Sequence, residues 1–72
     1  MDVTYQCTTR GAGPFHGVIL VTTPRHHKYL IWRQLGAGSA TEAEAYRKAL
    51  RALPEASVTF MRRDVDFLHL VR

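Results

Sequence analysis

The chain has 72 residues, of which 46% are hydrophobic and 22% charged, and its formal net charge at pH 7 is +4. This composition is typical of one small globular domain and excludes disordered, collagen-like and low-complexity proteins. No apolar run approaches the roughly 18 residues that span a bilayer, and the N-terminus lacks a signal-peptide pattern, so we expect a single cytoplasmic domain over residues 1–72 without membrane contact.

Three segments in the first half of the chain have the patterns of β-strands. Residues 3–7 alternate between apolar and polar side chains, with the period of two that is typical of a half-buried strand. Residues 15–22 are almost wholly apolar and rich in β-branched side chains, which predicts a buried strand. A short turn around Pro24 leads to a third strand over residues 28–35, so we expect an antiparallel three-stranded meander.

A helix is predicted after these strands. Ser39 and Thr41 each begin a capping box, so the helix starts at one of these two residues. Apolar residues at helical spacing then form one stripe, which consists of Ala43, Tyr46, Ala49, Leu50 and Leu53. Pro54 has no N–H and disfavours helical geometry at the residue before it, which predicts the end of the helix.

The C-terminal third predicts one more strand and a short final element. Residues 57–61 alternate between two faces, with Val58 and Phe60 on the same one, as in a strand. Residues 64–72 fit either a helix capped by Asp64 or a further strand, and we favour the helix. The expected fold class is therefore α+β, in the order β-β-β-α-β with a short C-terminal element.

Three segments of the chain resemble the ribonuclease H family. RGAGPFHGVIL (residues 10–20) is similar to the glycine–proline loop and second strand of these domains. GSATEAEAYRKAL (residues 38–50) is similar to the entry into their first helix, and VTFMRRDVDFL (residues 58–68) to their fourth strand and the turn after it. The resemblance implies about the first half of that fold, as in truncated relatives such as antitoxins of the HicB type, which bind a protein partner and self-associate.

The family resemblance also implies where catalytic carboxylates would stand. The family uses them to hold two Mg²⁺ ions that activate water. The first-strand aspartate would fall at Gln6 or Cys7, neither of which is acidic, and the last carboxylate would lie beyond Arg72. Asp64 matches one remaining position, and Glu44 lies one residue out of the family's register with Tyr46 at the other; these two are the weak metal candidates. Because two of four ligands do not build a two-metal site, we expect no enzyme, no catalytic residue, no metal site and no cofactor.

Two other groups of residues have chemistry to consider. His26 and His27 are adjacent in a turn, but no Cys, Asp or Glu stands near them in the sequence, which makes a poor metal site. Cys7 and His16 would form a nucleophile and a base if their strands were neighbours, although nothing supplies the third, orienting group. We expect Cys7 to be a buried structural cysteine.

A basic segment indicates nucleic-acid binding as a second hypothesis. Arg25, His26, His27 and Lys28 cluster at the tip of the predicted hairpin, and Trp32 and Arg33 follow on its third strand. Basic groups contact phosphates and exposed aromatic rings stack on bases. The alternative is that Trp32 belongs to the core and the tip is a solvated turn.

The first hypothesis for function is a non-catalytic interaction or regulatory module, homodimeric and with a possible protein partner. The second is a small basic protein that binds DNA or RNA through residues 25–33. The third is a residual metal-dependent nuclease. Salt-dependent binding of DNA or RNA would distinguish the second from the first.

Self-association is expected because one helix does not cover both faces of a four-stranded sheet. The predicted fourth strand is also an edge without proline or inward-pointing charge, and such edges pair readily with other chains. We therefore expect a symmetric homodimer paired through this strand or the C-terminal element. Its interface residues would be Val58, Phe60, Phe67 and Leu70.

Overall fold

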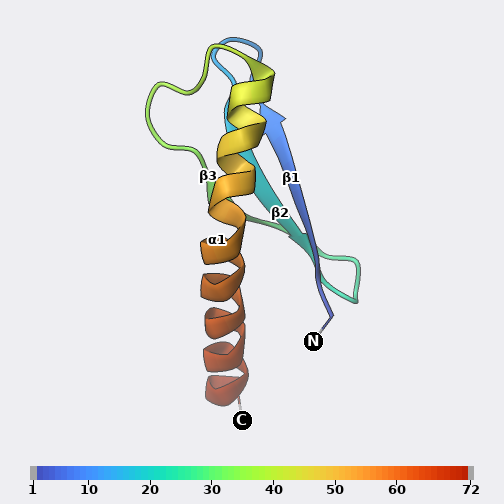
Figure 1. Cartoon of the computed structure of the whole chain (residues 1–72). Coiled ribbons are helices and arrows are strands. Elements are labelled where there is room, and N and C mark those ends of the chain that lie inside the picture. Colours follow the sequence, from blue (N-terminus) through green and yellow to red (C-terminus); the bar gives the residue numbers. More distant parts are fainter. Residues whose placement is uncertain (1, 72) are drawn as a thin grey trace.

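The computed structural model describes residues 2–71, and it describes the side chains of residues 2–62. Three strands, β1 (Thr4–Arg10), β2 (His16–Thr22) and β3 (Lys28–Arg33), precede one helix, α1 (Glu42–Val71). The strands form an antiparallel sheet in the order β1-β2-β3, and α1 lies along one of its faces (Figure 1). The predicted three-stranded meander followed by a helix is confirmed.

The core lies between β2 and α1. Ile19 and Val21 on β2 and Ala45 and Ala49 on α1 are fully buried. Gly17 allows the two backbones to approach closely, because a Cβ atom at this residue would overlap the carbonyl oxygen of Ala45. Small side chains on both elements therefore seat the first turns of the helix directly on the middle strand.

The prediction that the helix ends at Pro54 is wrong, and so is the predicted fourth strand over residues 57–61. α1 continues through Pro54 to Val71. Pro54 is exposed, so water can bond the carbonyl that is left without an N–H partner. Ala49 before the proline and Ala56 after it are buried in the same cluster. Packing on both sides of Pro54 thus outweighs its local cost.

The residues that suggested a strand lie on different sides of the helix. The ring of Phe60 packs edge-to-face on Tyr5 of β1, with ring centroids 6.4 Å apart. Val58, which a strand would place on the same face as Phe60, is 51% exposed. Leu53, Ala56 and Phe60 instead continue the helical spacing of the core-facing stripe.

Residues 64–71 also belong to α1. The favoured helical interpretation of this segment is confirmed, but as a continuation of one long helix rather than as a separate element capped by Asp64. The last turns of α1 extend beyond the end of the sheet (Figure 1). Arg72 lies outside the described residues.

Thr41 caps the N-terminus of α1. Its Oγ1 accepts a hydrogen bond from the N–H of Glu44 at 3.2 Å, as a capping side chain does. Of the two predicted helix starts, the one at Thr41 is therefore confirmed.

Gln34 fastens the loop between β3 and α1 to the sheet. Its Oε1 accepts a hydrogen bond from the N–H of Gly17, and its Nε2 donates one to Oγ of Ser39, both at 3.0 Å. Ser39 also exchanges two backbone hydrogen bonds with Phe15. Gln34 and Ser39 are both buried, so this linkage holds the chain just before the helix against β2.

We expect Gln34→Leu to lower the free energy of unfolding by about 1–3 kcal/mol, because the buried N–H of Gly17 loses its acceptor. Chemical denaturation followed by circular dichroism measures this change. Gln6→Leu is the matched control, since Gln6 is exposed on β1 and the same substitution there should change stability by no more than about 0.5 kcal/mol. Equal stability of the two variants would contradict the structural role of Gln34.

Candidate functional site

One face of the sheet, which we call the open face, is on the side opposite α1. Residues that are direct partners across antiparallel strands point to the same side. Cys7, Ile19 and Trp32 are such partners and pack in the core under the helix. The alternate positions therefore form the open face: Thr4, Gln6, Thr8, Arg10, His16, Val18, Leu20, Thr22, Lys28, Leu30 and Arg33. Of these residues, Val18 is fully buried.

The open face is basic. Arg10, Lys28 and Arg33 lie on it and are exposed. The sequence has no Asp or Glu between Asp2 and Glu42, so no carboxylate side chain comes from the strands or from the loops that join them. Because the strands and their loops supply no carboxylate to neutralise these cations, the cations attract anions from solution.

A hollow of about 220 Å³ lies at one end of the open face, lined by Arg10, Gly11, His16, Leu30 and Arg33. Arg10 and His16 are direct partners across β1 and β2. Nε2 of His16 donates a hydrogen bond to the carbonyl of Gly36 at 3.2 Å, which orients the imidazole ring. Two guanidinium groups around one hollow form a suitable site for a phosphate group.

The residues predicted to bind nucleic acid are found in three places. Arg25, His26 and His27 are exposed in the turn between β2 and β3, where His26 adopts a positive φ of 65°. Lys28 and Arg33 stand at the two ends of β3 on the open face. Trp32 points to the other side of the sheet, where it packs against the core cluster.

Arg10 and His16 were not among the residues predicted from the sequence to bind nucleic acid. They stand at opposite sides of a glycine- and proline-rich loop, in segments where the apolar pattern is the dominant signal. The register that pairs them across β1 and β2 brings them together with Arg33. The sequence did contain a signal for this pair. Arg10 and His16 flank that loop, and Arg10 continues the alternation of polar residues along β1.

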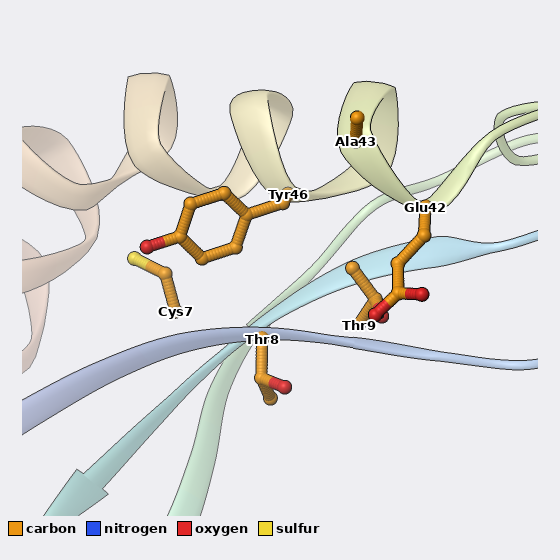
Figure 2. Close-up of a pocket in the computed structure, with 6 residues that line it drawn as sticks. All are labelled: Cys7, Thr8, Thr9, Glu42, Ala43 and Tyr46. Carbon is orange, nitrogen blue, oxygen red and sulfur yellow. The ribbon is translucent and has the colours of Figure 1, made fainter.

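A second hollow, of about 550 Å³, lies between β1 and the first turns of α1. Its lining consists of Cys7, Thr8, Thr9, Glu42, Ala43 and Tyr46. The side chain of Tyr46 extends from the helix, and its hydroxyl end points toward the sulfur of Cys7 (Figure 2). Oγ1 of Thr9 donates a long hydrogen bond of 3.4 Å to Oε1 of Glu42. We call this the β1–α1 groove.

Cys7 is half-buried rather than buried as predicted: it packs against the core cluster and also lines the β1–α1 groove. Burial raises the pKa of its thiol above the ordinary value of 9.0, so the thiol stays protonated near neutral pH and is a poor nucleophile. Cys7 faces the helix, whereas His16 lies on the open face. The sheet therefore separates the two members of the nucleophile–base pair that the sequence offered.

The positions that correspond to ribonuclease H carboxylates do not gather at one point. Gln6 is on the open face, Cys7 is under the helix, and Glu44 is exposed on the first turn of α1. The side chain of Asp64 lies outside the described residues. Among the residues that were described, no three His, Cys, Asp or Glu side chains are grouped as metal ligands would be.

The predicted dimer-interface residues have different surroundings. Val58 is exposed, while Phe60 packs on Tyr5 within the same chain. The side chains of Phe67 and Leu70 lie outside the described residues.

Comparison with protein-family models, curated proteins and solved structures found no match for this chain. In the described part of the chain, no helix combines the length and apolar character needed to cross a membrane.

Proposed function

We propose that this chain is a small non-catalytic module that binds the phosphate backbone of nucleic acid through the open face of its sheet. The observation that carries this proposal is the position of Arg10, Lys28 and Arg33 on one face to which the strands contribute no carboxylate. Lys and Arg side chains that neutralise phosphates supply most of the affinity in sequence-independent binding.

The same face favours contact with the backbone over contact with bases. No aromatic side chain belongs to the open face of the described strands: Trp32 and Tyr29 pair with Ile19 and Val21, which face the helix. Stacking on aromatic rings is how proteins hold unpaired bases. We therefore expect binding that depends strongly on salt and little on base sequence, with Arg25 in the adjacent turn extending the basic surface.

The test measures binding of labelled single-stranded and duplex oligonucleotides by fluorescence anisotropy over a range of salt concentrations. We expect Arg10→Glu combined with Arg33→Glu to weaken binding at least tenfold at low salt. The slope of log affinity against log salt should fall by about 2, roughly one for each lost phosphate contact. The matched control combines Arg47→Glu with Arg51→Glu, which makes the same change in net charge at exposed positions of α1.

Equal weakening by the two double variants would overturn the proposal, because net charge alone would then explain the binding. The fluorescence of Trp32, the only tryptophan, is a second readout. We expect its emission to change little on binding, since it packs under the helix. Strong quenching would mean that a base stacks on this ring and that the open face is not the contact surface.

The proposal includes the absence of nuclease activity. In a ribonuclease H-like arrangement, the first catalytic carboxylate would have to come from Gln6 or Cys7, and neither side chain is an anion at neutral pH. The strand–strand–strand–helix order supports the proposed resemblance to the first half of the ribonuclease H fold.

A further inference from the structure

The two edges of the sheet differ in how they are protected. β1 and β3 are the outer strands, so each has one unpaired edge. β3 begins with Lys28 and ends with Arg33, and charges of this kind discourage pairing with another chain. β1 carries no charged residue and no proline from Thr4 to Thr9. The edge of β1 is therefore the one open to a further strand.

The flank of α1 beside this edge is uncharged. Tyr46 lines the β1–α1 groove, and Phe60, further along the helix, packs on Tyr5 of β1. Between these two residues, the same helical stripe contains Leu50, Leu53 and Ser57. Tyr46 is 42% and Leu50 43% exposed. An apolar strip thus runs along the helix next to the unprotected strand.

The chain exposes more surface than a compact monomer of its mass. Its accessible surface is 5499 Å², whereas a folded protein of 8.2 kDa is expected to expose about 4,500 Å². Its radius of gyration of 13.5 Å likewise exceeds the value of about 11 Å expected for a compact domain of this length. The last turns of α1, which extend beyond the end of the sheet, contribute to this excess (Figure 1).

We propose that two copies of this chain associate through β1, edge to edge and antiparallel, around a two-fold axis perpendicular to the sheet. The two sheets would then continue into one another, with both helices on the same side and Tyr46 and Leu50 of each copy above the joint. An antiparallel strand pair of this kind is self-complementary, as an interface between identical subunits requires.

Charge does not oppose the approach of a second copy at this surface. Two molecules that each carry a net charge of +4 repel one another most strongly at their basic faces. Residues 4–9 and the adjacent helix stripe are uncharged, apart from Glu42 at one end of the groove. This surface is where two such molecules meet with little repulsion. It replaces the interface through residues 57–61 that the sequence suggested, because those residues are helical.

The only cysteine of the chain reports on this arrangement. Cys7 is the middle residue of β1, so a two-fold axis at the centre of the strand places it opposite Cys7 of the second copy. Opposed residues in antiparallel strands have Cα atoms about 4.5–5.5 Å apart, which is within the range that a disulfide bridges.

The first experiment measures molar mass by light scattering, without nucleic acid and at low and high salt. We expect a mass twice the 8.2 kDa of the chain that does not fall at high salt, since the interface is uncharged. Leu50→Glu should give a monomer, whereas Leu35→Glu should remain a dimer. Leu35 is the matched control because it is 89% exposed in the loop before the helix. A monomeric wild-type protein at high micromolar concentration would overturn the proposal.

The second experiment applies the thiol oxidant diamide and decides the matter even if Leu50→Glu fails to fold. We expect the wild-type chain to form a covalent dimer through Cys7. Cys7→Ser combined with Val58→Cys moves the single thiol to an exposed position of α1 outside the joint and should cross-link poorly. A dimer that cross-links through position 58 and not through Cys7 would show that the chains associate elsewhere. Both outcomes are independent of nucleic-acid binding.

Discussion

Gly17→Ala is expected to destabilise the fold by about 3 kcal/mol or more. The new Cβ atom would overlap the carbonyl oxygen of Ala45 and come within 3.2 Å of the backbone nitrogen of Ala49. Because both atoms belong to the helix backbone, relief requires α1 to move away from β2, which opens the core. A domain of this size rarely has more than about 3–5 kcal/mol of stability, so most of the cooperative unfolding transition should disappear.

Thermal denaturation followed by circular dichroism checks this prediction. Gly36→Ala is the control: Gly36 has a φ of 85°, but no atom lies within 4 Å of the place its new methyl group would take, so backbone strain alone should cost about 1–2 kcal/mol. Adding Ala45→Gly to the Gly17→Ala variant should not restore stability, because the overlapping atom is a backbone oxygen. Restoration by that second change would show that the helix is seated differently.

Pro54→Ala is expected to stabilise the protein by about 1–3 kcal/mol. Inside a helix, proline removes one hydrogen bond and costs roughly 3 kcal/mol relative to alanine. Replacing the proline recovers less than this full amount, because proline also lowers the conformational entropy of the unfolded chain and alanine does not. The variant should unfold at higher denaturant concentration and have a helical signal at least as strong as that of the wild-type protein.

The Pro54 prediction distinguishes the observed helix from the strand expected after it. If the helix ended before Pro54, replacing the proline would bring no gain and would loosen the connection. Pro24→Ala is the control, because Pro24 lies in the exposed turn between β2 and β3. There the substitution should lower stability slightly or leave it unchanged.

The first three strands, their order and the start of the helix were predictable from the sequence. Alternation in β1, the apolar run of β2 and the turn around Pro24 are local signals, and they are formed as expected. The cap at Thr41 is also local, since its hydrogen bond joins residues only three apart. Signals of this kind survive folding because the interacting groups are already neighbours in the chain.

The extent of the helix was decided by tertiary packing. Residues 57–61 fit a strand by alternation and a helix by the spacing of Ala56 and Phe60 from Ala49, and Pro54 favoured the strand. Burial of Ala56 in the core and the contact of Phe60 with Tyr5 stabilise the helical conformation of these residues over a strand. Both contacts need the sheet to be present, so no local pattern could weigh them against the proline.

The open face required the same long-range information. From the sequence alone, the cations at Arg25 and Lys28 are identifiable as a group because they are close in the chain. Arg10, His16 and Arg33 are far apart in sequence and meet only through the register of three strands. That same register turns Trp32 toward the helix, because partners across antiparallel strands must share a side. The sequence by itself thus determined the three strands, the start of the helix and the excess of positive charge. Tertiary packing decided where the helix ends, and strand pairing decided which side chains share a surface.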